Sequence, residues 1–299
     1  MTKLRRNHNA QGKGLQTTFR MVILLIITIL ALVGGFIYLS NANLAEESQE
    51  VIGKPELPIT YLPTSNGEIV KHKHYTLSYI EKAEQAEWTA YILTRSSLKI
   101  PNVPRYDYFS PDPNVSTLSA NHNDYSNSGY SRGHLVPAGD MAFDTLAMRE
   151  TFYMSNISPQ IRGFNGGIWR ELEENVRDWA FSNDSLYVIT GPVLEQTDLK
   201  SIGKSSVAVS SRFYKVILDY SGLEKKGIAF IIPNEVSDRR LEDFIVPIDS
   251  VEQVTKLDFF NDMINDQLEE QLESYVNPKL WKISEKRYQL RVNTWNKEN

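Results

Sequence analysis

The feature that most constrains this chain is a run of 18 residues, 22–39, in which Thr28 is the only polar side chain. An α-helix of that length just spans the hydrocarbon core of a bilayer, which is about 30 Å thick. No polar residues break the run, as they would on the outer face of a helix that packs on a globular core. The sequence therefore predicts a membrane segment, 21–40, ahead of a separately folded domain.

Charges on either side of this run predict its orientation. The five basic residues of the first 45 positions all precede the run, and no acid accompanies them: Lys3, Arg5, Arg6, Lys13 and Arg20. The positive-inside rule places residues 1–20 in the cytoplasm and the rest of the chain outside it, periplasmic or extracellular. The alternative is a cleaved signal peptide and a secreted protein, with Ser40-Asn41-Ala42 as the small-residue site. We favour the anchor because the run is longer than the usual apolar core of a signal.

The remainder of the chain is acidic and contains no cysteine. Residues 46–299 hold 27 basic and 37 acidic residues, a net charge of −10. This excludes the broad positive surface common in nucleic-acid-binding proteins, although a small basic site on an acidic body remains compatible with it. The lack of cysteine excludes disulfide frameworks, thiolate nucleophiles and cysteine-based zinc sites. It leaves the redox compartment open.

Residue patterns divide the rest into a linker, 41–60, a domain, 61–277, and a basic C-terminal tail, 278–299, which we expect to be solvated or loosely packed. Alternating or continuous apolar segments with β-branched and aromatic residues predict strands. These segments are 75–79, 88–93, 186–190, 206–209, 213–218 and 227–232. Apolar spacing of three and four residues predicts a helix over 164–181, and further helices near 240–246 and 250–275. Many strands and few helices favour an α+β fold with an antiparallel sheet.

Three short motifs carry the candidate chemistry. They are Gly-Tyr-Ser-Arg-Gly-His at 129–134, Asn-Ile-Ser-Pro-Gln at 156–160, and 165–173, which begins with Asn165 and ends with Glu173. Together they supply an imidazole, a metal-binding amide, a carboxylate and a guanidinium. That set is sufficient to cut a phosphodiester bond with a single Mg²⁺ ion. The long Pro-, Asn- and Ser-rich segment 101–130 is predicted to be a loop, where function often resides.

At these motifs the chain resembles the DNA/RNA non-specific endonucleases, a family that includes secreted bacterial nucleases and mitochondrial endonuclease G. The resemblance runs in matching order from about Tyr75 to Pro247. It implies the ββα-metal (His-Me finger) nuclease fold, α+β with a central, mainly antiparallel sheet. It also implies Mg²⁺ as the cofactor, with Mn²⁺ able to substitute.

The resemblance assigns the general base and the metal ligand. His134 matches the base, and a histidine suits this role because its ordinary pKa of about 6.5 leaves it largely neutral at working pH. The alternative is a histidine satisfied in the core. Asn165 matches the one direct protein ligand to Mg²⁺, an ion that keeps several waters and so needs few protein ligands. The alternative for Asn165 is a helix cap.

Four further residues match family positions in the site. Glu173 is expected to hold metal-bound water or the histidine, and a solvated helix residue is its alternative. Arg132 and Arg105 match two functional arginines that bind phosphate, a role suited to a fixed fork of donors. For Arg105, a surface arginine is the alternative. Asn156 matches an asparagine that contributes to catalysis, and a buried turn residue before Pro159 is its alternative.

Two positions qualify this assignment. Ser131 stands where the family usually has an acid, and this exchange removes neither the base nor the metal ligand. His72 and His74, in Lys-His-Lys-His, are interpreted as a surface strand rather than a metal site, because no matching partner is evident.

The sequence thus predicts a membrane-anchored, Mg²⁺-dependent, sugar-non-specific endonuclease that leaves 5′-phosphate ends. Its partners would be DNA and RNA, and the membrane through residues 21–40, while a homodimer is left open. One alternative is a catalytically weak module of the same fold that binds nucleic acid at the cell surface. Another is a phosphodiesterase of narrow substrate range.

Overall fold

The computed structural model describes residues 61–194, 199–221, 224–261 and 263–298, together with five helical positions, Met21, Thr28 and 33–35. The chain forms two units, Met1–Lys54 and Pro55–Asn299. The linker 41–60 and most of the expected membrane segment 21–40 lie outside the described residues. Within the described ranges, no helix combines the length and hydrophobicity needed to span a bilayer. The anchor therefore stays a prediction.

A seven-stranded sheet forms the centre of the described part of the second unit, in the order β1-β2-β3-β6-β9-β10-β11. Its strands are β1 (Glu68–Lys71), β2 (Thr76–Ile80), β3 (Gln85–Thr94), β6 (Ser185–Pro192), β9 (Arg212–Asp219), β10 (Lys226–Pro233) and β11 (Ile245–Val246). Every neighbouring pair is antiparallel. The predicted central antiparallel sheet of a mixed α and β fold is confirmed.

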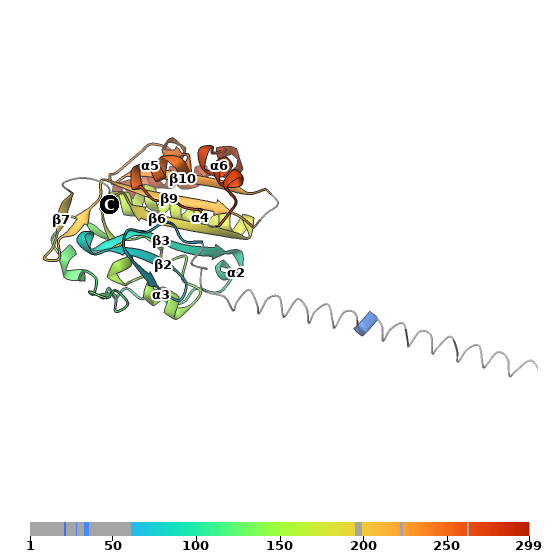
Figure 1. Cartoon of the computed structure of the whole chain (residues 1–299), viewed down its shortest axis with the longest axis horizontal. Coiled ribbons are helices and arrows are strands. Elements are labelled where there is room, and N and C mark those ends of the chain that lie inside the picture. Colours follow the sequence, from blue (N-terminus) through green and yellow to red (C-terminus); the bar gives the residue numbers. More distant parts are fainter. Residues whose placement is uncertain are drawn as a thin grey trace, which may run out of the picture. The chain divides into compact units, whose positions relative to one another are not determined.

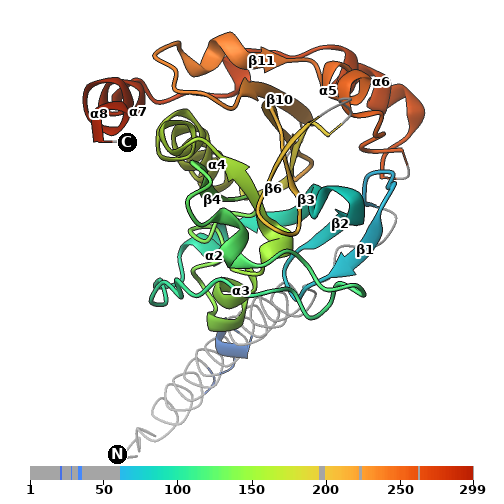
Figure 2. The same cartoon turned by 90° about the vertical axis from the view of Figure 1, so that its left-hand side faces the viewer.

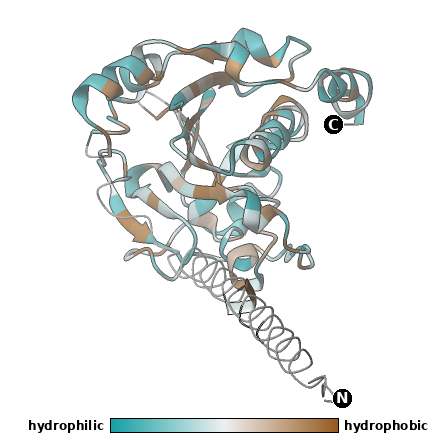
Figure 3. Cartoon of the chain, turned by 90° about the vertical axis from the view of Figure 1, so that its right-hand side faces the viewer, coloured by the Kyte–Doolittle hydropathy of each residue, from teal (hydrophilic) through white to brown (hydrophobic). Residues whose placement is uncertain are grey.

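Each face of this sheet supports its own hydrophobic core. Because successive side chains of a strand point to opposite faces, Val188 of β6 joins one buried cluster and Ile189 joins the other. α4 (Arg170–Asn183) covers the first face, and α5 (Ile248–Thr255) and α6 (Asp266–Ser274) cover the second. Figure 2 shows β10 between α4 and the pair α5–α6, and hydrophobic residues follow the central strands in Figure 3.

The three motifs lie in a small ββα unit beside the sheet. β4 (Ser131–His134) pairs antiparallel with β5 (Ile157–Gln160), so that His134 lies opposite Ile157. The chain between these strands contains α3 (Thr145–Glu150), and the chain after them leads through a turn into α4. Two short elements complete this region, namely α2 (Arg95–Leu98) and the hairpin of β7 (Lys200–Ile202) and β8 (Val207–Val209). Figure 1 shows α2, α3 and β7 in place around β2 and β3.

The predicted helix over 164–181 is broken into two parts. Residues 164–169 form a wide π-helical turn, and Gly167 within it leaves helical geometry at φ −105° and ψ −109°. The regular helix, α4, begins only at Arg170. The assumption that Asn165 and Glu173 project from one continuous helix is therefore wrong.

Two other predicted helices also differ. Residues 240–246 form a 3-10 turn, Leu241–Phe244, followed by β11. Residues 250–275 form α5 and α6, separated by a segment that buries Phe259 and Phe260. The apolar pattern continues through this segment because both aromatic side chains face the core, and it therefore resembles one long helix in the sequence.

The C-terminal residues are packed rather than solvated, contrary to expectation. They form α7 (Glu285–Leu290), a π-helical turn over 291–295 and α8 (Asn296–Glu298). Trp281 and Trp295 are buried, and Arg291 is fully buried with its Nε donating to Glu171 of α4 at 2.5 Å. Figure 2 shows α7 and α8 on the side of α4.

His72 is also buried, so the interpretation of a surface strand is wrong at this position. It follows β1, and its Nε2 lies 2.9 Å from Oδ2 of the buried Asp112. Its ring stacks on Tyr75 with centroids 4.5 Å apart. His72 thus has a structural role, pairing with an acid from the long loop.

Candidate active site

The strand that carries His134 is fixed by Asn156. The Oδ1 of this fully buried asparagine accepts a hydrogen bond from Val136 N at 2.9 Å, and its Nδ2 donates to Val136 O at 3.0 Å. Nδ2 also donates to Thr151 O at 2.9 Å, while Leu135 N donates to Asn156 O at 3.0 Å. The side chain is therefore occupied by backbone groups. These contacts match the alternative of a buried residue, which here positions the chain directly after His134.

The imidazole of His134 packs against two phenyl rings, which also contact each other with centroids 5.0 Å apart. Its centroid is 5.7 Å from that of Phe109 and 4.9 Å from that of Phe152, the latter edge-on. Its Nε2 is buried and has no hydrogen-bond partner among the described residues. Burial, assisted by the charge of Arg105, lowers the pKa of His134 to about 3. The ring is therefore neutral at physiological pH and retains an unused nitrogen.

Both predicted arginines lie against these rings. The Arg105 guanidinium is centred 5.0 Å from the Phe152 ring, and its Nε pairs with Asp107 at 2.6 Å. The Arg132 guanidinium is centred 5.4 Å from the Phe109 ring. The structure thus brings both arginines to the two phenyl rings that contact His134.

The donors of the two arginines remain partly available. The Arg105 side chain is about half exposed. Arg132 donates from Nη2 to His122 O at 2.8 Å, and its buried Nε has no partner within the described ranges. A buried guanidinium nitrogen without an acceptor is costly, so an anionic ligand at this position would satisfy it.

The side chain of Asn165 is oriented by Ser131. Asn165 Nδ2 donates to Ser131 Oγ at 3.1 Å, and Ser131 Oγ in turn donates to Gln160 O at 2.8 Å. This chain of hydrogen bonds ties the turn before α4 to both strands of the ββα unit. No residue of the described part donates to Asn165 Oδ1, so that the amide oxygen is left for another ligand. An amide oxygen is a hard donor of the kind that Mg²⁺ accepts, and the residues present fit this ion.

Close packing at Gly133 keeps the two strands of this unit in register. A Cβ at this position would overlap the side chain of Gln160, which lies across the β4–β5 pair. Glycine is therefore the residue that allows this approach between Ser131 and His134.

Glu173 lies on α4 beside a buried positive charge from the sheet. Lys215 of β9 is buried, donates from Nζ to Thr190 Oγ1 at 2.5 Å, and lies 5.0 Å from the Trp169 ring centre. Burial raises the pKa of Glu173, and the charge of Lys215 opposes that rise. No hydrogen bond among the described residues joins Glu173 to His134 or Asn165. The expected role of Glu173 therefore stays a prediction.

An ion pair between Arg177 and Asp140 belongs to the same environment. Arg177 Nη1 of α4 donates to Asp140 Oδ1 at 2.7 Å, and Tyr91 OH donates to Asp140 Oδ2 at 2.6 Å. Both charges act on Glu173, Arg177 lowering its pKa and Asp140 raising it. Sequence reasoning missed Asp140 and Lys215. A lysine within the apolar strand 213–218 was the available signal.

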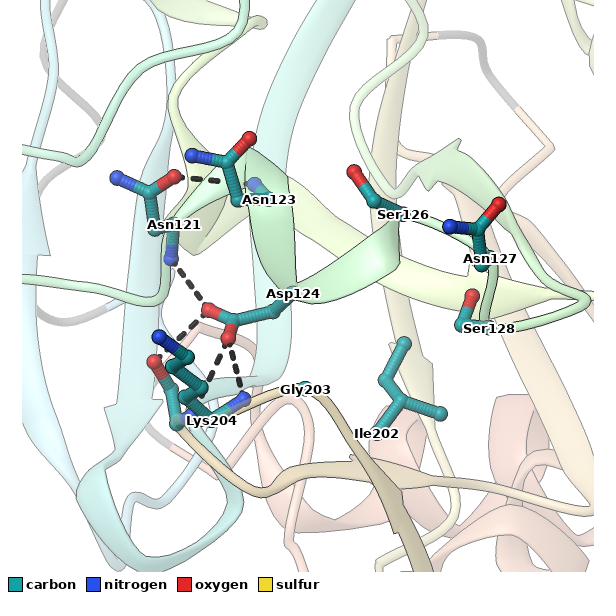
Figure 4. Close-up of a pocket in the computed structure, with 10 residues that line it drawn as sticks. Asn121, Asn123, Asp124, Ser126, Asn127, Ser128, Ile202, Gly203 and Lys204 are labelled. Carbon is teal, nitrogen blue, oxygen red and sulfur yellow. Dashed lines mark hydrogen bonds between the residues drawn. The ribbon is translucent and has the colours of Figure 1, made fainter.

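A polar pocket of about 580 Å³ opens beside the site. It lies between the 3-10 turn His122–Tyr125, whose His122 carbonyl binds Arg132, and the turn from β7 to β8 (Figure 4). The Asp124 carboxylate joins these segments by accepting from Lys204 N at 2.7 Å and from Ser205 N at 3.1 Å. The pocket wall is thereby fixed although no basic side chain of the described ranges forms an ion pair with Asp124.

Comparison with known proteins places this geometry in a family. Residues 54–266 match the model of the DNA/RNA non-specific endonuclease family. The chain is 36% identical over 216 residues to nuclease C1 of Cunninghamella echinulata var. echinulata, covering 67% of this chain and 86% of that protein. It is 33% identical over 210 residues to human mitochondrial endonuclease G, covering 66% of this chain and 71% of that protein.

Two further relatives agree. Human mitochondrial nuclease EXOG is 34% identical over 214 residues, and the match covers 66% of this chain but only 58% of that protein. Among solved structures, an EndoG/EndoGI complex superposes with a TM-score of 0.63 at 33% identity. That match covers 71% of this chain and 89% of the other.

Proposed function

The chain belongs to the DNA/RNA non-specific endonuclease family and is a nuclease, and on that premise we propose that it hydrolyses both DNA and RNA in a Mg²⁺-dependent reaction. In this proposal His134 is the general base and Asn165 holds the metal ion. The products carry 5′-phosphate ends.

The observation that carries the proposal is that the His134 ring is neutral and has an unpaired nitrogen. A base must be neutral and must have a nitrogen that is free to accept a proton. His134 meets both conditions, because burial lowers its pKa to about 3 and its Nε2 has no partner among the described residues. A histidine with only a structural role would be expected to use that nitrogen in a hydrogen bond, as His72 does with Asp112.

The remaining groups divide the work of binding and charge stabilisation. Arg132 and Arg105, which lie over the two phenyl rings that contact His134, bind the phosphate whose charge grows in the transition state. Asn165 Oδ1, oriented by Ser131, holds the metal ion. When bound there, Mg²⁺ supplies Lewis-acid stabilisation of the scissile phosphate and the departing 3′-oxygen. The negative charge of a bound phosphate also raises the proton affinity of His134, which assists its action as a base.

The first test is cleavage by the full chain of plasmid DNA and of RNA, with Mg²⁺ and with EDTA. We expect metal-dependent cutting of both polymers, which His134→Ala lowers by at least about 10²-fold and Asn165→Ala abolishes. His74→Ala is the matched control for loss of an imidazole, because His74 packs on Phe143 and not on the two phenyl rings that contact His134. Its cleavage rate should equal that of the wild type.

The other outcomes identify the alternatives. A folded wild-type chain that binds DNA but cuts neither polymer is the nucleic-acid-binding module. Cleavage of a small phosphodiester without cleavage of polymers indicates a phosphodiesterase of narrow range. Undiminished turnover of a correctly folded His134→Ala variant would refute the assigned base.

We also propose that residues 21–40 anchor the domain to a membrane, with the nuclease domain outside the cytoplasm. The support is the apolar run 22–39 and the basic residues that precede it. Protease added to intact cells or spheroplasts should digest the nuclease domain while the chain remains in the membrane fraction. Recovery of the whole chain from the soluble cytoplasmic fraction contradicts the proposal.

A further inference from the structure

Three carboxylates meet between α5 and α6, away from the residues assigned to catalysis. Asp249 and Glu252 lie on α5 and Glu273 lies on α6, and one oxygen from each lies within 4.8 Å of the others. Both helices pack on the face of the sheet opposite α4 (Figures 1 and 2). We call these three residues the α5–α6 carboxylate cluster.

Glu273 is the unusual member of this cluster. It is only 6% exposed, and its Oε1 is buried without a hydrogen-bond partner among the described residues. Glu252 accepts one hydrogen bond, from Phe259 N at 2.9 Å. No lysine or arginine of the described ranges forms an ion pair with any of the three. A buried carboxylate oxygen that lacks a partner is strongly unfavourable, so Glu273 requires a ligand or a proton.

Neighbouring acidic residues make an unpaired negative charge on Glu273 still less favourable. Asp258 and Glu269 add further negative charge, and with burial as the largest cause the pKa of Glu273 rises to about 9 and that of Glu252 to about 7. The charged groups that act most strongly on either carboxyl group are all negative. Like charges this close repel, and the repulsion is stronger in a partly buried site than in water.

The helices that carry the cluster have little room to separate. Ile248 and Val251 of α5 and Leu272 of α6 are buried in the same hydrophobic core. Both helices also approach Gly227 of β10, where an added Cβ would lie 2.8 Å from Ile248 Cδ1 and 3.4 Å from Leu272 O. Relieving the repulsion by moving α5 from α6 would expose this core. The three carboxylates are thus held together by apolar packing.

We propose that the α5–α6 carboxylate cluster is a second metal site, which binds Ca²⁺. Calcium takes six to eight oxygen ligands at about 2.3–2.6 Å in flexible geometry, so two of its ligands lie no more than about 5 Å apart. The oxygens of Asp249, Glu252 and Glu273 meet that limit. Mg²⁺ is smaller, prefers strict octahedral geometry and usually takes one or two carboxylates, which makes it the poorer match.

The test is calcium binding by the full chain, with the catalytic metal ligand removed. Asn165→Ala serves as the reference protein, so that Ca²⁺ cannot bind through Asn165. After treatment with EGTA, thermal unfolding and titration calorimetry are measured against Ca²⁺. We expect saturable binding, and at a free Ca²⁺ concentration of 100 times Kd a rise in midpoint temperature of about 5 °C or more.

Two variants in the Asn165→Ala background assign the effect. Glu273→Gln should reduce Ca²⁺ affinity at least about tenfold, and Glu252→Gln provides the same test if Glu273→Gln does not fold. Glu270→Gln is the matched control, because it makes the same exchange on the exposed side of α6 and should bind as the reference does.

Three results would overturn the proposal. They are absence of a calcium effect in the reference protein, an effect that persists undiminished in Glu273→Gln and Glu252→Gln, and an equal effect of Mg²⁺, which removes the assignment to calcium. In otherwise wild-type protein, Glu273→Gln should leave Mg²⁺-dependent cleavage at 25 °C unchanged. This separates failure of the second site from failure of the nuclease assignment.

Discussion

At the scale of single residues, the site depends on atoms left without partners. His134 Nε2 and Arg132 Nε are buried and unpaired among the described residues, whereas Asn156 next to them is completely hydrogen bonded. Sequence reasoning assigned all three residues to the catalytic site. It could not separate them, because an asparagine that binds substrate and one that binds backbone have the same letter in the sequence.

The pH dependence of cleavage should reflect the depressed pKa of His134. Its neutral, active form persists down to about pH 3, because the charged form is the one disfavoured by burial and by Arg105. We therefore expect that protonation of His134 does not change kcat/KM at saturating Mg²⁺ between pH 5 and pH 8. A histidine with the ordinary pKa of about 6.5 would lose about 30-fold over that range.

Glu173 must be separated from His134 in this measurement, because burial raises the pKa of its carboxyl group. The profile of Glu173→Gln, measured in parallel, removes that carboxyl. An acidic limb near pH 6.5 that survives in Glu173→Gln contradicts the assigned environment of His134.

Ser131 should act through Asn165. Ser131→Ala removes the acceptor that orients the Asn165 amide, and loss of such an outer partner typically weakens metal binding by about 10–100-fold. We expect a higher Mg²⁺ concentration for half-maximal cleavage, with the rate at saturating Mg²⁺ nearly restored. Ser131→Thr keeps the hydroxyl and should retain the wild-type requirement. Equal Mg²⁺ curves for Ser131→Ala and wild type exclude this role.

At the scale of elements, the C-terminal segment supports the turn that carries Asn165. Arg170 lies over the Trp295 ring with its guanidinium centre 4.0 Å from the centroid. Asn296 Oδ1 occupies the space beside Gly167, where an added Cβ would lie at 2.7 Å. The break between the turn and α4 is therefore covered by residues that lie beyond the region matched by the family model, 54–266.

Arg291 should be the most important charge in this segment for stability. Arg291→Ala leaves the buried Glu171 without its ion-pair partner, and removal of one member of such a pair typically costs about 3–5 kcal/mol. Urea unfolding should show this loss in the free energy of unfolding. Arg239→Ala, which breaks an exposed pair with Asp243, should cost less than about 1 kcal/mol. Similar losses in both variants would show that the buried Arg291–Glu171 pair stabilises the fold no more than an exposed pair does.

An element could be predicted from the sequence where its own residues carry a recognisable pattern. It was missed where only a distant partner defines it. β3, β6, β9 and β10 are long, apolar or alternating, and each was predicted close to its observed bounds. β4 was missed because its four residues, Ser-Arg-Gly-His, have no strand pattern of their own and pair only with β5. The packing of the C-terminal segment was missed because its arginines and lysines resemble a solvated tail until Glu171 is placed opposite Arg291.

At the scale of the whole molecule, DNA binding should depend only weakly on salt, because few basic residues contact phosphate and the net charge is negative. The chain carries −5 overall, and two arginines are assigned to phosphate binding. Each neutralised phosphate of duplex DNA contributes about −0.9 to the slope of log K against log salt. For DNA binding by the Asn165→Ala chain in EDTA, we expect a slope near −2.

Single substitutions test which contacts produce that slope. Arg132→Gln and Arg105→Gln should each make it shallower by about 1, while Arg239→Gln on the exposed pair with Asp243 should leave it unchanged. A slope several times steeper in the reference chain implies basic contacts other than these two arginines.

Because a chain is synthesised from its N-terminus, the C-terminal segment is made after the residues on which it packs. Every strand of the sheet, and Asn165 itself, precedes residues 291–296 in the sequence. A nascent chain can therefore form the sheet and the His134 strand while Gly167 and Glu171 still lack Asn296 and Arg291. Under the proposed function, the hydrolytic centre reaches its supported form only after translation has passed Asn296.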